Sequence, residues 1–178
     1  MADLRFGGFV YRDRKKPVIA AVDGLATAGG CELVLACDML VATTRSAFGL
    51  AEATRNLIAG AGGLFRLPRA IGRAAAMEAI LTGEPFTAQR AFELGMVNKL
   101  VEPNTVIEAA LDLAQRVCKA APLAVWASRK IVLASETEPD QTLIDMTNKE
   151  FGAVLASEDT KEGLTAFIEK RQPNWQGK

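Results

Sequence analysis

The chain has 178 residues, of which 49% are hydrophobic, and this is enough to build one domain with a substantial core. Lysine plus arginine and aspartate plus glutamate both number 21, so no net charge draws the chain to nucleic acid or to an anionic membrane surface. Histidine is absent, which excludes Ser-His-Asp triads, Cys-His pairs and metal sites with histidine ligands.

We expect neither a membrane span nor a signal peptide in this sequence. No apolar run is long enough to span a bilayer, and "MADLRFGGFVYRDRKKP" lacks the apolar region of a signal peptide. The three cysteines, Cys31, Cys37 and Cys118, are an odd number without metal-ligand spacing. We therefore expect reduced thiols and a cytoplasmic protein.

The first part of the chain predicts strands that alternate with helices led by glycine. Residues 17–24, "PVIAAVDG", form a continuous apolar run between a proline and a glycine, which is typical of a short buried strand. The sequence then predicts a helix from Ala28 to about Ala36 with Thr27 as its N-cap, a strand at 39–43, a loop at 45–63, and a helix that follows Gly60–Gly63. This repeated order indicates an α/β core.

The remainder of the chain predicts mostly helices. A helix that starts at residue 73 ends at Gly83 as its C-cap, Thr87 caps a short helix, and residues 96–102 form a last strand. Amphipathic helices follow at 104–120, 122–135, 139–155 and 157–171. We therefore divide the chain into a core at 1–102 and a helical region at 103–178, which is large enough to dock on the core or on a neighbouring chain.

One carboxylate stands out in the stretch "DGLATAGGCELVLACD" at 23–38. Glu32 lies two residues after a glycine pair on an otherwise apolar helix. An ionised carboxylate is costly to bury unless it is paired or has a chemical task. Three interpretations are open: a functional role, a side chain that reaches solvent, or an ion pair with Arg45.

The glycines have a functional and a structural interpretation. Gly29 and Gly30 would let a ligand approach the first N–H groups of a helix, which can donate to a phosphate, a carboxylate or an oxyanion; the alternative is a tight turn or close helix packing. Neither nucleotide-binding fingerprint is present. The local pattern predicts that Glu52 is a surface glutamate, and nothing in the composition or periodicity connects it with Glu32. The same pattern predicts that the "GAGG" run at 60–63 is a flexible turn.

Taken together, several motifs resemble the enoyl-CoA hydratase branch of the crotonase superfamily. They are "KPVIAAVDGLATAGGCELVLACDMLVAT", "FGLAE", "GAGGLFRLPRAIG", "LTGEPFTAQRAFELGMVNKLVE" and "DTKEGLTAFIEKRQPNW", and they extend in order from about Lys16 to Trp175. The resemblance implies a spiral ββα core that is short at its N-terminus, followed by a C-terminal helical region that mediates oligomerisation. It also implies trimers, often paired into hexamers.

The resemblance assigns roles to particular residues. Gly29, with Gly30 beside it, would give an oxyanion-hole N–H to a thioester carbonyl, and Gly60 would hold a water through its backbone N–H. Glu32 and Glu52 would be the two catalytic carboxylates. We expect Glu32 to act as the base toward water and Glu52 as the proton donor to Cα, in a reversible syn addition of water to a 2-enoyl-CoA.

The same resemblance bears on cofactors and partners. No metal or redox cofactor is needed, and coenzyme A enters as part of the substrate, as in fatty acid β-oxidation. The last helix would approach the CoA of a neighbouring subunit, with Phe167 beside adenine and Lys170 near phosphate. The alternative for both residues is an ordinary helix with one core face and one solvent face.

Two features depart from the family pattern. Relatives carry early strands and a "GADL"-like motif that supplies the second oxyanion donor. In this sequence only "MADL" at the start weakly resembles that motif. Losing one oxyanion donor lowers the rate by a factor on the order of 10²–10³. This leaves open a truncated or noncatalytic crotonase-like subunit, or a related CoA-dependent dehydratase or isomerase. Ala28 replaces a glycine of many relatives, which we expect to be tolerated if its φ is negative.

Overall fold

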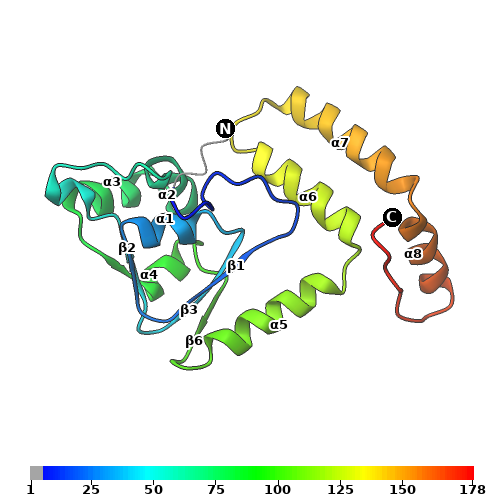
Figure 1. Cartoon of the computed structure of the whole chain (residues 1–178), viewed down its shortest axis with the longest axis horizontal. Helices are drawn as coiled ribbons and strands as arrows, with labels where there is room; N and C mark the ends of the chain where they lie inside the picture. Colours follow the sequence, from blue (N-terminus) through cyan, green and yellow to red (C-terminus); the bar gives the residue numbers. More distant parts are fainter. Residues whose placement is uncertain (1–5) are drawn as a thin grey trace. The chain divides into compact units, whose positions relative to one another are not determined.

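The computed structural model describes residues 6–178 and has the predicted α/β architecture (Figure 1). The chain forms two compact units, the first ending at Leu113 and the second spanning Ala114–Lys178. The boundary that we predicted after residue 102 lies just before helix α5 (Val106–Cys118), and the compact units divide within this helix.

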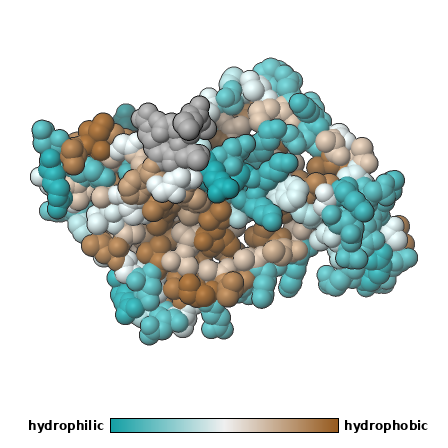
Figure 2. Space-filling model, viewed as in Figure 1, coloured by the Kyte–Doolittle hydropathy of each residue, from teal (hydrophilic) through white to brown (hydrophobic). Residues whose placement is uncertain are grey.

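The first sheet contains the three strands that the sequence predicts. Its order is β1-β3-β6, all parallel, with β1 (Ile19–Val22), β3 (Met39–Thr43) and β6 (Lys99–Val101). β1 is a continuous apolar run, as expected of a parallel strand inside an α/β core, and β6 begins with the exposed Lys99. Apolar side chains gather on the visible face of the first unit over β1 and β3 (Figure 2).

A second sheet was not predicted. β2 (Leu25–Thr27) runs parallel to β4 (Ala47–Gly49), which pairs in antiparallel fashion with β5 (Phe86–Thr87). In this register Thr27 faces Gly49. Strands of two or three residues are too short to produce a readable hydrophobic period, so the sequence at 45–63 was interpreted as a loop.

Short helices cover the sheets of the first unit. They are α1 (Gly29–Leu35), the 3₁₀ helix η1 (Glu52–Arg55), α2 (Gly63–Ile71), α3 (Arg73–Thr82) and α4 (Ala88–Glu93). Two predicted caps are confirmed: Gly83 ends α3 with a φ of 70°, and the Thr87 side chain accepts a hydrogen bond from the Arg90 N–H at 3.1 Å. The fully buried side chains of Phe48, Leu50 and Leu67 lie at the centre of this core.

The second unit contains α6 (Pro122–Ala134), α7 (Asp140–Leu155) and α8 (Glu158–Ile168), close to the predicted helices. The buried carboxylate of Asp159 holds the C-terminal tail, because it accepts the N–H groups of Gln176 and Gly177 at 2.7 and 2.9 Å. Neither α6 nor α7 has a fully buried residue. These helices therefore leave much of their apolar side-chain surface uncovered within the second unit.

Two further expectations concern the cysteines and the membrane. All three cysteines are free in the structure. Over residues 6–178, no helix combines the length and the hydropathy needed to cross a bilayer.

Candidate active site

The entry to helix α1 is a strained corner at Ala28. This residue follows β2 and has a φ of 50° and a ψ of −127°, so the condition under which we expected alanine to be tolerated, a negative φ, is not met. Thr27 is not the N-cap that we predicted, because it belongs to β2. Ala28 occupies the cap position and has no side-chain cap.

Gly29 and Gly30 begin α1, and their surroundings differ. A Cβ on Gly29 would collide with the ring of Phe6, so a larger residue here would require that ring to move. A Cβ on Gly30 would meet no atom within 4 Å. The first turn of the helix is therefore covered by an aromatic side chain at one glycine and open at the next.

Glu32 is one of the most buried polar residues of the chain, with 3% of its surface exposed. Its Oε1 accepts two backbone hydrogen bonds, from the N–H groups of Ala61 at 2.7 Å and Gly63 at 2.9 Å. The interpretation that its side chain reaches solvent was therefore wrong. Two N–H donors on one oxygen are the usual means of holding a buried carboxylate.

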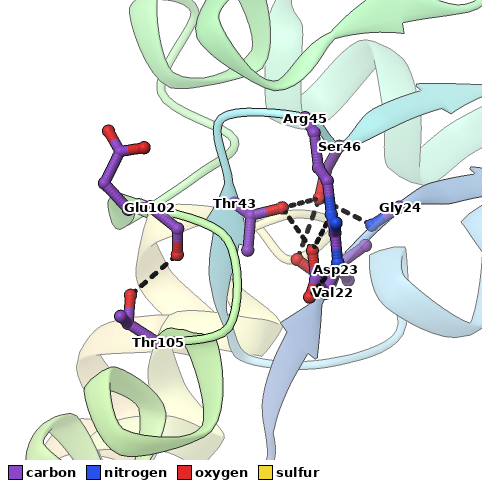
Figure 3. Close-up of polar contacts among 8 residues, drawn as sticks. All are labelled: Val22, Asp23, Gly24, Thr43, Arg45, Ser46, Glu102 and Thr105. Atoms are coloured by element: carbon purple, nitrogen blue, oxygen red, sulfur yellow. Dashed lines mark hydrogen bonds and ion pairs between the residues drawn. The ribbon is translucent and has the colours of Figure 1, made fainter.

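Arg45 is not the partner of Glu32, because it binds Asp23 instead (Figure 3). Its Nε and one terminal nitrogen donate to the two oxygens of Asp23 at 2.6 and 2.7 Å. The Arg45 hydrogen bond holds the pKa of Asp23 below its ordinary value, and a bond from Thr43 at 2.8 Å acts in the same direction. The pair joins the turn before β2 to the turn before β4.

Ser46 strengthens the same connection, as Figure 3 shows. Its hydroxyl donates to the Val22 carbonyl at 2.9 Å and accepts from the Gly24 N–H at 3.0 Å. The strands β2 and β4 therefore start from one hydrogen-bonded junction. They run in parallel toward Gly29 and Glu52 respectively.

Glu52 begins the 3₁₀ helix η1 and is partly buried, so the surface position expected from pattern alone was wrong. Its Oε2 is buried and, within the described part of the chain, has no hydrogen-bond partner. Burial raises the pKa of the Cys31 thiol to about 12, and the charges of Glu52 and Glu32 add to that rise. The structure therefore brings both glutamates within electrostatic range of one buried thiol.

Gly60 lies beside the groups that contact Glu32. Its carbonyl accepts a hydrogen bond from the Tyr11 hydroxyl at 3.2 Å. The N–H groups that bind Glu32 belong to its neighbours Ala61 and Gly63, and sequence reasoning missed them. Backbone donors leave no signal in a sequence except the glycines that shape the turn; here Gly62 has a φ of 104°.

The remaining predicted site residues lie in the second unit. Phe167, near the end of α8, is 83% exposed, and Lys170 follows the helix with a φ of 54°. Phe167 is thus on the solvent face of its helix. Residues 6–178 contain no group of three or more Cys, Asp or Glu side chains arranged to hold a metal ion.

The chain matches known proteins over almost its whole length. The family model described as enoyl-CoA hydratase/isomerase matches residues 10–178. A crystal structure of enoyl-CoA hydratase from Mycobacterium tuberculosis H37Rv superposes with a TM-score of 0.93 at 48% identity, covering 96% of this chain and 68% of that one.

Curated relatives are similar at somewhat lower identity. The 2,3-dehydroadipyl-CoA hydratase of Escherichia coli K12 is 39% identical over 92% of this chain and 64% of its own length. The carnitinyl-CoA dehydratase of Salmonella arizonae is 38% identical over 99% of this chain and 70% of its own length. The chain thus spans just under two thirds of the first of these relatives. Match, fold and motifs agree, and the chain belongs to the enoyl-CoA hydratase/isomerase family of the crotonase superfamily.

Proposed function

We propose that the protein takes part in the reversible hydration of a 2-enoyl-CoA thioester, as a lyase. The observation that carries this proposal is the unequal pair of glutamates. One oxygen of Glu32 is held by two N–H donors, whereas the Oε2 of Glu52 is buried without a partner in the described structure. A buried hydrogen-bond acceptor without a donor costs free energy of folding. Unsatisfied groups of this kind are typical of catalytic or binding sites.

The roles of the two carboxylates follow from their partners. Backbone N–H groups suit an ionised carboxylate, so Glu32 acts as the base that takes a proton from water. The water oxygen bonds to Cβ while Glu52 gives a proton to Cα, and the thioester oxygen carries the charge that develops between these events. Glu32 ends protonated and Glu52 ionised, and proton exchange restores the starting state. Dehydration uses the same steps in reverse.

The start of α1 supports stabilisation of the thioester oxygen. The Gly29 N–H, with Gly30 beside it, is our candidate donor at a helix terminus where N–H groups have no partner within the helix. Gly60 is our candidate for holding the water. Coenzyme A enters only as part of the substrate, and the proposed chemistry requires no separate cofactor.

Assembly is part of the proposal. Apolar side chains of the C-terminal helices, including Phe151, Phe167 and Ile168, are more than half exposed. Burial of such a surface drives association, so we propose a homotrimer or hexamer. In that assembly Phe167 and Lys170 would contact the CoA of a neighbouring subunit, and Phe167→Ala would raise KM for acyl-CoA with little change in kcat.

A noncatalytic crotonase-like subunit is the second candidate. The same exposed helices favour it, because they would allow assembly without turnover. Dehydration or isomerisation of another acyl-CoA is a third candidate, and the similarity to a protein named carnitinyl-CoA dehydratase supports it.

The test is the loss of conjugated-enoyl absorbance of crotonyl-CoA. We expect turnover that falls by at least about 10²-fold in both Glu32→Gln and Glu52→Gln. No turnover by folded, assembled protein would leave the noncatalytic subunit as the better account. Turnover that survives both substitutions would contradict the carboxylate mechanism.

A further inference from the structure

A single peptide group separates Tyr11 from Glu32. The N–H of this peptide belongs to Ala61 and donates to Oε1 of Glu32 at 2.7 Å. The carbonyl of the same peptide belongs to Gly60 and accepts from the Tyr11 hydroxyl at 3.2 Å. Because the peptide is planar, fixing the direction of its C=O also fixes the direction of its N–H.

The backbone around Tyr11 is held in place by its neighbours. Val10 is 2% exposed and belongs to a buried cluster with Ala36 and Ala61. Arg66 donates to the carbonyls of Val10 and Ala61 at 2.7 and 3.0 Å, and its guanidinium lies 5.5 Å from the centre of the Tyr11 ring. Arg66 thus ties the segment that carries Tyr11 to the turn that binds Glu32.

The two peptides that donate to Glu32 are supported differently. The second donor, the Gly63 N–H, belongs to a peptide whose carbonyl, Gly62, accepts the Arg66 backbone N–H at 3.0 Å at the start of α2. Helix backbone therefore holds that peptide. The peptide of Gly60 and Ala61 is instead held by a side chain, the hydroxyl of Tyr11.

A hydrogen bond to a carbonyl also polarises its peptide and strengthens the N–H as a donor. Such a cooperative series of hydrogen bonds runs from the Tyr11 hydroxyl through the Gly60 carbonyl and the Ala61 N–H to the Glu32 carboxylate. Loss of the Tyr11 hydrogen bond would weaken the hydrogen bond from the Ala61 N–H to Glu32 and make the position of the Glu32 carboxylate less well defined. A shift of this kind changes the rate of a reaction that depends on a positioned base.

We propose that Tyr11 is a positioning residue that acts on Glu32 through the peptide between Gly60 and Ala61. The consequence for turnover rests on the proposed function, because it requires Glu32 to act as the base. The hydrogen-bonded series itself does not, and it can be measured without substrate.

The experiment compares the whole protein with Tyr11→Phe, which removes the hydroxyl and keeps the ring beside Arg66. We expect the Ala61 amide proton and the Gly60 carbonyl carbon to move upfield in NMR spectra. We also expect kcat to fall about 2- to 10-fold, the range of one hydrogen bond, with KM changed less than about twofold.

The matched control is Thr105→Val. The Thr105 hydroxyl also donates to a backbone carbonyl, that of Glu102 at 2.8 Å (Figure 3). That peptide does not lead to Glu32. We expect Thr105→Val to leave both NMR signals and kcat unchanged.

Two results would overturn the proposal. One is an Ala61 amide signal that is the same in Tyr11→Phe as in the parent, or that moves equally in Thr105→Val. The other is an active parent whose kcat per folded molecule does not change in Tyr11→Phe while its Tm falls. A parent without turnover that still shows the expected NMR shifts would refute the proposed function and support the hydrogen-bonded series.

Discussion

The Ala28 N–H donates to the Gly49 carbonyl at 2.9 Å, although Ala28 has a φ of 50°. The bond continues the ladder between β2 and β4 by one residue beyond Thr27. The ladder therefore holds an alanine in a conformation that glycine adopts more readily. This strain lies directly before the first residue of α1.

Replacing Ala28 with glycine should stabilise the protein. Strain of this kind costs about 1–3 kcal/mol, and glycine loses roughly 0.5–1 kcal/mol in backbone entropy, so we expect a net gain between about 0 and 2.5 kcal/mol. Urea unfolding measures the change. Ala26→Gly, two residues earlier in β2, is the control and should lower the free energy of unfolding. A lower free energy of unfolding in Ala28→Gly would contradict the inference that the Ala28 backbone is strained.

Glu52→Met should raise the free energy of unfolding. The substitution removes a buried oxygen that has no partner in the described structure, and an unsatisfied group of this kind costs about 1–3 kcal/mol. Glu32→Gln should have the opposite effect, because Glu32 accepts two N–H bonds. The exposed Glu78 provides the control, and Glu78→Met should change stability by less than about 0.5 kcal/mol. Destabilisation by Glu52→Met would mean that its carboxylate is satisfied.

The three thiols should react with an alkylating reagent in a fixed order. Cys118 is exposed and should react first, whereas burial raises the pKa of Cys37 and slows it. Cys31 is fully buried and its pKa is raised to about 12, so we expect its alkylation to be more than about 10³-fold slower than that of Cys118. Pulsed labelling with mass spectrometry measures the order, and Cys118→Ser should remove the fast phase. Early labelling of Cys31 would show that α1 opens in the native protein.

Acid should release the C-terminal tail. The Arg171 hydrogen bonds, followed by that of the Asn174 N–H, lower the pKa of Glu162 from 4.5 to about 2. The stability that Glu162 contributes is therefore present above about pH 4.5 and is lost as the pH falls toward about 2. Trp175, whose Nε1 donates to the Lys119 carbonyl at 3.0 Å, should report this loss by fluorescence in a Trp126→Phe background.

Glu162→Gln should flatten that acid transition. Glu158→Gln is the comparison variant, because the hydrogen bond to Lys161 is the main cause that lowers the pKa of Glu158 and the charge of Lys178 at the end of the tail contributes least, so we expect a smaller effect on the transition. An unchanged acid transition in Glu162→Gln would contradict this prediction.

Much of the fold could be predicted because the long elements carry strong local patterns. The strand at 19–22 is an unbroken apolar run and the strand at 39–43 is apolar up to Thr43, while Thr87 and Gly83 mark helix ends by their own chemistry. β2 and β4 could not be predicted in this way. They are three residues long, and Leu25 exposes 64% of its surface, so pairing between distant segments defines them.

The site was less predictable than the fold. Burial of Glu32 followed from its apolar neighbours, but its partners are backbone groups of residues 29 and 31 positions away. Arg45 looked like a partner because it was the nearby cation, yet the turn before β4 directs it to Asp23. The pairing of Glu52 with Glu32 came from family resemblance, since no local pattern connects them.

The ladder between β2 and β4 also limits how this sequence can change length. Gly29 lies two residues beyond Thr27, and Glu52 lies three beyond Gly49, while Thr27 and Gly49 face each other. An inserted or deleted residue in either interval would move one side of the site relative to the other. Residues 53–58, all exposed, lie outside both intervals. Insertions and deletions among homologues should therefore accumulate there and be absent from the two short intervals.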